Sequence, residues 1–151
     1  HDLANHVAES LKEELSPFEL LIVIPDEMPL VMIDFGLMEQ ALHNLVLNAT
    51  QNAAVGTTIR LKFFYDHNNL TIQVMDRGKG FPENELEAVF NKFYRGKDAA
   101  AGGTGLGLSI VKGFVEAHAG TVDAQNRQNG GAVFTIKIYT HGKYLDDMAT
   151  E

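Results

Sequence analysis

Two pairs of strand-like segments, each closed by a short turn, most constrain how this chain can fold. Apolar and polar residues alternate along the segments, which predicts strands with one buried face. Asn68-Asn69 separates the first pair, and Asn129-Gly130-Gly131, a strong hairpin signal, separates the second. We therefore expect two antiparallel hairpins at the centre of the fold. The four expected strands are Thr58–Tyr65, Leu70–Val74, Thr121–Asn126 and Val133–Tyr139.

Helical patterns lie before and between these strands and predict a cover for one face of the sheet. Three segments repeat apolar residues at the spacing of an α-helix. Asp34 is a suitable N-cap for the second helix, and Gly56 ends it. Two strands, Phe18–Ile24 and Leu30–Ile33, are expected before it, and a short helix over Glu83–Phe93. The apolar stripes are Leu3, Val7, Leu11 and Leu15; Met38, Ala41, Leu42, Leu45 and Ala49; and, within Gly105–Ala119, Leu106, Ile110, Phe114 and Ala117.

The order of these elements predicts the architecture. Helix, strands, helix, hairpin, loop, helix and hairpin together predict an α/β (α+β) two-layer sandwich. We expect a mixed, mainly antiparallel sheet of about five strands with three main helices on one face. A length of 151 residues suits one domain, which we place at 1–139. The polar tail 140–151 is expected to be frayed.

Composition and charge exclude several classes of protein. The chain has no cysteine, which excludes disulfide scaffolds and thiolate metal sites. Its formal net charge of −8 disfavours nucleic acid and anionic lipid as partners. No apolar run approaches the roughly 20 residues of a membrane span. A polyanionic ligand would have to be held locally, by backbone amides, a metal ion and a few cations.

The glycine-rich segment Gly102–Leu108, directly before a helical pattern, is the clearest chemical signal. Its closely spaced glycines let backbone N–H groups approach phosphate oxygens, and the helix adds the positive end of its dipole. A flexible helix start is the alternative, but each glycine there costs about 1 kcal/mol relative to alanine. A phosphate site is therefore favoured. It is neither a P-loop, since no Gly-Lys pair precedes Ser or Thr, nor a dinucleotide fingerprint, since Leu108 and Ile110 replace its third glycine.

Asn44 and Asn48 form a second, weaker signal on the helix after Asp34. They lie one turn apart, so their side chains project in nearly the same direction. An asparagine carbonyl can ligate Mg²⁺ together with substrate phosphates and water. Taken alone, an exposed or capping pair of amides explains these residues better.

Two further segments carry signals that remain open when each is taken alone. Asp76–Gly80 follows a buried strand, so its carboxylate could accept a hydrogen bond from an adenine amine, but the sequence is equally a common turn. Phe90–Arg95 could anchor aromatic rings in the core while Lys92 and Arg95 reach an anion. The alternative is a short core-packing helix with a snorkelling cation.

In this order, the four segments resemble the N, G1, F and G2 boxes of a known domain. It is the ATP-binding catalytic domain (HATPase_c, Bergerat fold) of bacterial two-component sensor histidine kinases. The resemblance covers nearly the whole chain, from Leu3 to Ile138. The matching residues are Asn44-Leu45-x-x-Asn48-Ala49, Asp76-x-Gly78-x-Gly80, Phe90-x-Lys92-Phe93-Tyr94-Arg95 and Gly103-Thr104-Gly105-Leu106-Gly107-Leu108-Ser109-Ile110-Val111.

The resemblance implies ATP and Mg²⁺ as ligands and assigns roles to residues. Asn48 would bind the metal, Asp76 would read the adenine amine, and Tyr94–Gly102 would be the nucleotide lid. Asn44, Lys92 and Arg95 would be catalytic. The implied ATP-binding residues are Asn44, Asn48, Gln51, Asn52, Asp76, Gly78, Gly80, Lys92, Tyr94, Arg95, Gly103, Thr104, Gly105, Leu106, Gly107 and Leu108.

Three positions depart from relatives in ways that bear on function. Gln51 stands where the family often has a cation, and Asn52 where it often has an aromatic residue, so both bear on ATP affinity. Asn44 stands where ATP-hydrolysing relatives place a glutamate as general base. An amide cannot take a proton at neutral pH, which favours transfer of phosphate to a supplied nucleophile over hydrolysis.

The resemblance also implies partners that this chain lacks. None of its six histidines has the His-Glu-x-x-x-x-Pro context of the family's phosphoacceptor. The acceptor histidine is therefore expected on a separate dimerisation domain, with onward transfer to a response regulator. We expect a cytoplasmic domain of an inner-membrane sensor kinase, with no nucleic acid and no direct membrane contact. An anti-sigma-type serine kinase and a non-catalytic nucleotide-sensing module are the alternatives.

Overall fold

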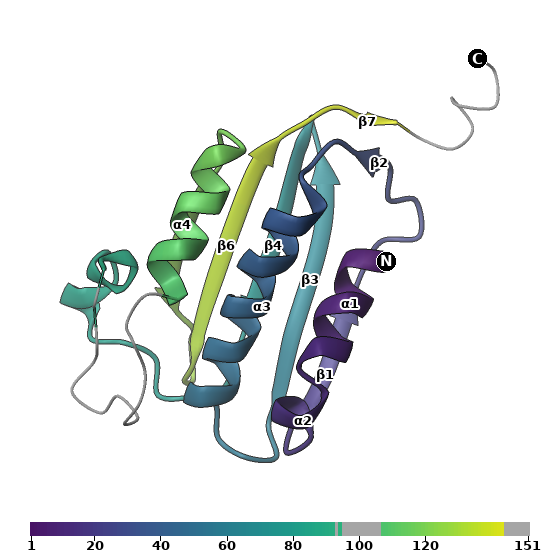
Figure 1. The fold of residues 1–151 in the computed structure, drawn as a ribbon. Coiled ribbons are helices and arrows are strands. Elements are labelled where there is room, and N and C mark those ends of the chain that lie inside the picture. Colours follow the sequence, from purple (N-terminus) through teal and green to yellow (C-terminus); the bar gives the residue numbers. More distant parts are fainter. Residues whose placement is uncertain (93, 95–106, 144–151) are drawn as a thin grey trace.

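A five-stranded sheet covered on one face by helices forms the body of the described protein (Figure 1). The computed structural model describes residues 1–92, 94 and 107–143. The strands run in the order β1-β3-β4-β6-β5, with β1 parallel to β3 and the other pairs antiparallel. The predicted two-layer sandwich with a mixed, mainly antiparallel sheet is confirmed. Its strands are β1 (Glu19–Val23), β3 (Thr58–Asp66), β4 (Asn69–Met75), β5 (Thr121–Asn126) and β6 (Ala132–Tyr139).

Three main helices, α1, α3 and α4, lie on the same face of the sheet, as predicted (Figure 1). α3 begins after Asp34, whose side chain accepts a hydrogen bond from the Leu37 N–H at 3.0 Å, so the predicted N-cap is confirmed. Its apolar stripe, which includes Met38, Leu42 and Leu45, is buried. The helices are α1 (Asp2–Ser10), α2 (Lys12–Leu15), α3 (Phe35–Asn52) and α4 (Gly107–Ala117).

The inner face of the sheet meets these helices in a hydrophobic core. Along β3, Ile59 and Leu61 are buried while the residues between them are exposed, which is the predicted alternation. On β6, the Phe134 ring contacts Phe81 and Phe90 edge-on, at centroid distances of 6.0 and 5.9 Å. These two aromatic residues anchor the segment after β4 to the same core as the helices.

Two of the predicted helices are interrupted. The N-terminal one breaks at Leu11, which is buried with φ −114° and separates α1 from α2. The one expected over Glu83–Phe93 is instead two 3₁₀ turns, and Phe93 lies outside the described residues. Packing of Phe90 against Phe134 overrides the local pattern here, because the chain must turn twice to reach the core. The two turns are η1 (Glu83–Glu85) and η2 (Ala88–Phe90).

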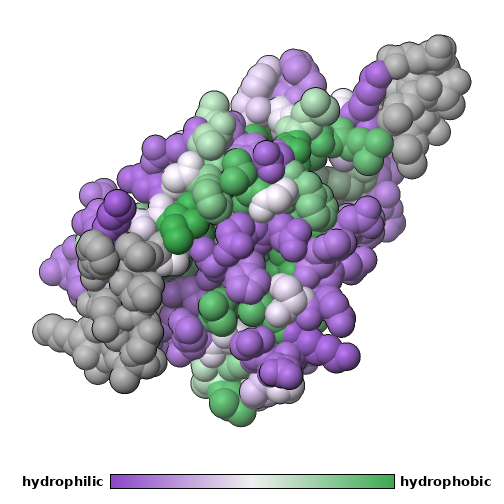
Figure 2. All heavy atoms as spheres, viewed as in Figure 1, coloured by the Kyte–Doolittle hydropathy of each residue, from purple (hydrophilic) through white to green (hydrophobic). Residues whose placement is uncertain are grey.

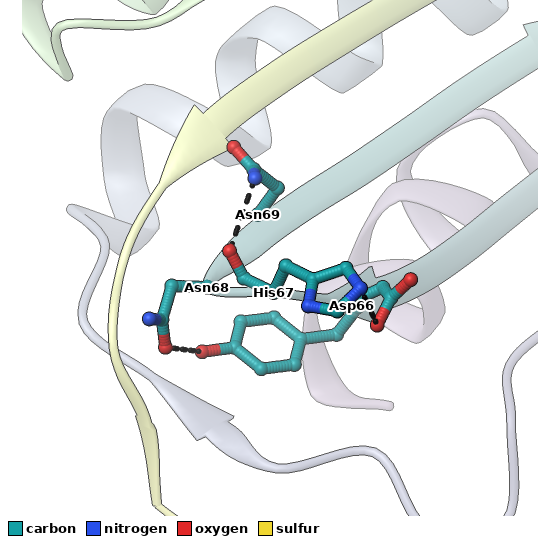
Figure 3. Close-up of polar contacts among 5 residues, drawn as sticks. Asp66, His67, Asn68 and Asn69 are labelled. Carbon is teal, nitrogen blue, oxygen red and sulfur yellow. Dashed lines mark hydrogen bonds and ion pairs between the residues drawn. The ribbon is translucent and has the colours of Figure 1, made fainter.

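The turn between β3 and β4 lies one residue earlier than predicted (Figure 3). Asp66 pairs with Asn69, so the turn residues are His67 and Asn68, with φ values of 51° and 62°. Positive φ at both positions matches the twist of a two-residue hairpin. The Tyr65 hydroxyl lies 3.1 Å from Asn68 Oδ1, and this contact helps hold the turn in that register.

The chain continues past β6 into a second small sheet instead of fraying at Thr140. There β7 pairs antiparallel with β2. The Tyr65 hydroxyl donates to the Thr140 carbonyl at 2.8 Å and accepts from the Gly142 N–H at 2.6 Å. The frayed-tail prediction is wrong for residues 140–143, since these tertiary contacts hold them, and 144–151 lie outside the described residues. The strands are β2 (Leu30–Val31), shorter than the predicted Leu30–Ile33, and β7 (Gly142–Lys143).

The helical side of the molecule mixes polar and apolar surface (Figure 2). Exposed apolar residues of the domain include Leu30 of β2, Met32 directly after it, and Phe35 at the start of α3. Exposed apolar residues interspersed with polar ones are ordinary on a folded domain. None of the described helices combines the length and the apolarity that a membrane crossing requires.

Candidate functional site

Helix α3 is joined to α4 by hydrogen bonds near both ends of α4. The Asn44 side chain donates from Nδ2 to the Gly107 carbonyl at 3.2 Å. At the other end, the Asp34 N–H donates to His118 Nε2 at 2.9 Å, so Nδ1 of that ring carries the proton and donates to the Phe114 carbonyl. Asn44 is thereby held at the start of α4, where the predicted phosphate loop ends.

Asn48, one turn after Asn44 on α3, has a side-chain oxygen that bears on ligand binding. Its Oδ1 is buried and has no hydrogen-bond partner among the described residues. A buried amide oxygen without a partner is costly, so such an atom in a folded protein calls for an explanation. A hard cation bound by one protein oxygen, phosphates and water would satisfy it, and the residues present therefore fit Mg²⁺.

Asp76, directly after β4, is the buried carboxylate of the site. It is 2% exposed, and its Oδ1 accepts from the Gly78 N–H at 2.8 Å and the Ala132 N–H at 3.3 Å. Burial raises the pKa of this carboxyl, opposed by the two backbone hydrogen bonds and by the charge of Arg127. Both bonds fall on Oδ1, so Oδ2 could accept a hydrogen bond from a ligand donor such as an adenine amine.

The loop after Asp76 lies against the C-terminal end of α3. Gly78 forms an isolated antiparallel bridge with Ala53, the C-cap of the helix. A Cβ on Gly78 would collide with the Asn52 carbonyl, so only glycine permits this approach. The fold thus brings the predicted N and G1 segments, about 30 residues apart in the chain, together into one site.

Several predicted ATP-binding residues are engaged within the protein or face solvent. The Asn52 side chain donates to the Asn48 carbonyl at 2.8 Å, and Gln51 is exposed. The Tyr94 hydroxyl donates to Glu85 Oε1 at 3.3 Å, and burial, reinforced by that carboxylate, raises the pKa of the tyrosine. Lys92 is exposed just after η2. Their roles toward a nucleotide stay predictions.

The predicted phosphate loop is described only at its end. Gly107 and Leu108 open α4 as its first two residues. Asn44 contacts the first of these through its carbonyl, as described above. The remaining predicted residues lie outside the described residues. They are Arg95, Gly103, Thr104, Gly105 and Leu106.

The turn between β5 and β6 supports the Asp76 loop, a role that the sequence did not predict. Asn126 accepts from the Phe81 N–H at 2.9 Å and donates to the Phe81 carbonyl at 2.8 Å. Arg127 donates from Nη1 to the Asp76 carbonyl at 2.8 Å. A Cβ on Gly131 would collide with that same carbonyl. The Asn-Gly-Gly signal marked this turn only as a hairpin, and nothing local indicated its contact with the loop.

Asn126→Ala is expected to weaken ADP binding about tenfold, because it removes two hydrogen bonds that fix the loop after Asp76. Isothermal titration calorimetry would measure this. Gln125→Ala, at the neighbouring exposed position, is the matched control and should leave the affinity unchanged. Equal ADP affinity for the two variants would show that Asn126 does not position the loop.

The chain matches a model of one protein family across most of the site and the fold. Residues 34–141 match the family described as histidine kinase-, DNA gyrase B-, and HSP90-like ATPase. That range includes Asn44, Asn48, Asp76 and the turn that supports the loop. The match therefore covers the described site as a whole.

Individual relatives are sensor kinases much longer than this chain. The sensor protein KdpD of Escherichia coli (strain K12) is 37% identical over 124 residues, which cover 82% of this chain and 14% of that protein. Sensor histidine kinase YvrG of Bacillus subtilis (strain 168) is 36% identical over 122 residues, covering 79% of this chain and 21% of that protein. The solved catalytic domain of histidine kinase ThkA superposes with a TM-score of 0.80 at 28% identity, covering 91% of each chain.

Proposed function

The chain belongs to the histidine kinase-, DNA gyrase B-, and HSP90-like ATPase family, as an ATP-binding catalytic domain of sensor histidine kinases, and we propose that it presents Mg-ATP to a histidine on a separate domain. One observation carries the proposal. The same helix that ends against the adenine-reading loop also holds a buried, unpartnered amide oxygen on Asn48. A base contact and a metal ligand in one site suit a nucleoside triphosphate.

The described residues have separate roles in the proposed transfer. Asp76 binds the adenine amine, and Asn48 holds the metal through its unpartnered oxygen. Bound Mg²⁺ neutralises negative charge on the phosphate oxygens. Lys92, exposed after η2, brings a cation to the same region, and Arg95, outside the described residues, is proposed to add a second. The proposed site therefore acts by positioning the nucleotide and by neutralising the negative charge of its phosphates.

Asn44 favours transfer to a nucleophile over hydrolysis. Its amide cannot accept a proton, and its two polar atoms already bind Gly107 and Gln40. Water therefore finds no general base at this position. A neutral imidazole attacks with its own lone pair, so an N–P bond forms as the bond between the γ-phosphorus and the ADP oxygen breaks.

The acceptor and the downstream partner belong to parts of the protein outside this chain. The chain spans 14% of KdpD and 21% of YvrG, so much of such proteins lies beyond a domain of this kind. We propose that the parent carries a dimerisation domain with the acceptor histidine and passes the phosphoryl group to a response regulator. We also propose that this domain works in the cytoplasm beneath a membrane-bound sensor.

Mixing this chain with the parent's helical acceptor domain and radiolabelled Mg-ATP tests the proposal. We expect a phosphoryl group on the acceptor domain that is lost in acid and stable in base, as phosphohistidine is. Replacing the acceptor histidine by glutamine should abolish the label. An acid-stable phosphoserine on a partner would instead support a serine kinase. No transfer, despite tight ADP binding, would support a nucleotide-sensing module.

A further inference from the structure

The outer face of the sheet, opposite the helices, is uncovered by any described helix (Figure 1). Its strands alternate, so one set of side chains is buried under the helices and the other points away from them. Outward residues of the inner strands include Arg60, Lys62 and Lys137, all exposed. A sheet face of this size without a cover is a candidate contact surface.

The strands of the outer face carry equal numbers of basic and acidic side chains, and the loop residues that continue its rows give it a basic excess, opposite to the charge of the chain. The chain has twelve basic and twenty acidic residues. The outer face and the loop residues that continue its rows carry five basic side chains against three acidic ones. The acidic ones are Glu19, Asp66 and Asp123, and Asp66 lies at the far turn beside His67. The basic ones are Arg60, Lys62, Arg77, Arg127 and Lys137.

Three arginines concentrate positive charge at one end of this face. Arg77 donates from Nη1 to the carbonyls of Gln128 and Gly130 at 2.9 and 3.1 Å, and Arg127 is held on the Asp76 carbonyl. Arg60 lies in register with Met75, two residues before Arg77. Burial lowers the pKa of Arg127, and the charges of Arg77 and then Arg60 lower it further.

The charge of the buried Asp76 opposes the lowering of the Arg127 pKa, but the carboxylate does not form an ion pair with the guanidinium. Within the described parts of the chain, none of the five basic side chains forms an ion pair within 4.0 Å. Lys62 lies over the Phe64 ring at 5.5 Å from its centroid. Each guanidinium has five N–H donors, and the contacts above use only Nη1 of Arg77 and Arg127. Donors in a fixed fork geometry are thus available to carboxylates from outside.

The surroundings of the cations suit a polypeptide. Leu21, Val23 and Phe64 are exposed by 36 to 38% and lie among the charges. An open hollow of about 340 Å³ lies beside them, lined in part by Gln73, Thr135 and Lys137. Apolar contacts, amide and hydroxyl groups and cations in one patch match the composition of protein interfaces.

We propose that the outer sheet face is a docking surface for a partner protein that presents aspartate and glutamate side chains. An anionic bilayer or a nucleic acid is a uniform polyanion, and the net charge of −8 opposes its approach to the rest of the domain. A protein with a local acidic patch can bind this face without approaching the acidic rest of the domain. The opposite charges of the two surfaces orient the partner as it approaches. The proposal does not depend on the nucleotide site, which lies on the helical side.

A charge-reversal experiment on this chain tests the docking surface. The probe is a fluorescein-labelled ten-residue glutamate peptide, and its anisotropy reports binding at low salt. Arg60→Glu with Lys62→Glu should weaken binding about tenfold or more. The matched control, Lys12→Glu with Lys112→Glu on α2 and α4, changes the net charge equally and should weaken it less than about threefold. Peptide-dependent shifts of β3 and β4 amide resonances should accompany binding.

The outcomes separate the proposal from its alternatives. ADP affinity should be the same in both double variants, which confirms that each is folded. If both double variants lose the same share of peptide binding, the change in net charge alone explains the loss. That result would overturn the docking surface. Tighter binding to phosphatidylserine vesicles, or to single-stranded DNA of ten phosphates, than to the peptide would also overturn it, because the partner would then be a membrane or a nucleic acid.

Discussion

Asp76→Asn is expected to weaken ADP binding about hundredfold while the domain stays folded. The asparagine oxygen can take the place of Oδ1 and keep the bonds from Gly78 and Ala132. The second position then becomes an NH₂ group, a donor facing the amine donor of adenine. Because the substitution also removes a buried charge, the melting temperature without nucleotide should not fall.

Calorimetry with ADP and thermal unfolding of the free protein would measure the two effects separately. Asp123→Asn, at an exposed position of β5, is the control for loss of a carboxylate and should change neither quantity. Inorganic triphosphate, which lacks the base, should bind the Asp76 variant as well as it binds the wild type. ADP affinity within twofold of wild type would exclude Asp76 as the adenine-binding residue.

The same carboxyl predicts how nucleotide binding depends on pH. Burial raises the pKa of Asp76 in the folded protein, so protonation removes the acceptor at a higher pH than in an exposed aspartate. ADP affinity should therefore fall as the pH is lowered through this raised pKa, and Asp76→Asn should remove that step. The contribution of Asp76 to the free energy of unfolding has the opposite dependence. It is fully present below the pKa of the unfolded state and is lost as the pH rises through the folded value.

Local chemistry made much of the fold predictable from the sequence. Asp34 caps α3 through its own side chain, and Asn129 has the positive φ of 69° that its turn requires. Each of these signals acts within three residues of its partner. Alternation along β3 also needed no knowledge of the rest of the chain, because one face of a strand is buried whatever covers it.

The larger failures involve contacts between distant residues. A strand was expected near β2, but its partner β7 is only two residues long and lies more than 100 positions later, so no periodicity marks β7 or the pairing. Asn126 binds Phe81 across 45 positions, and an asparagine at a strand end has no local feature that distinguishes this role from a turn. In the site, the spacing of Asn44 and Asn48 placed both on one face of α3. It could not show that only Asn48 keeps an unpartnered oxygen.

Asn48→Ala is expected to reduce phosphotransfer at least about hundredfold and to remove the effect of Mg²⁺ on ATP affinity, because it removes the proposed protein ligand of the metal. The substitution deletes a buried oxygen that has no partner among the described residues, so it removes a polar group that is costly to bury. The small cavity left behind offsets this gain. The melting temperature without nucleotide should therefore change by only a few degrees.

Asn52→Ala is the matched control, because it removes an amide one turn later that donates to the Asn48 carbonyl. The oxygen that we propose as the metal ligand remains in this variant, so Mg²⁺ should still strengthen ATP binding. ATP titrations at several Mg²⁺ concentrations distinguish the two. If Asn48→Ala and Asn52→Ala respond identically to Mg²⁺, the amide of Asn48 is not the ligand and its buried oxygen needs another partner. A large fall in melting temperature for Asn48→Ala alone would make that partner a structural one.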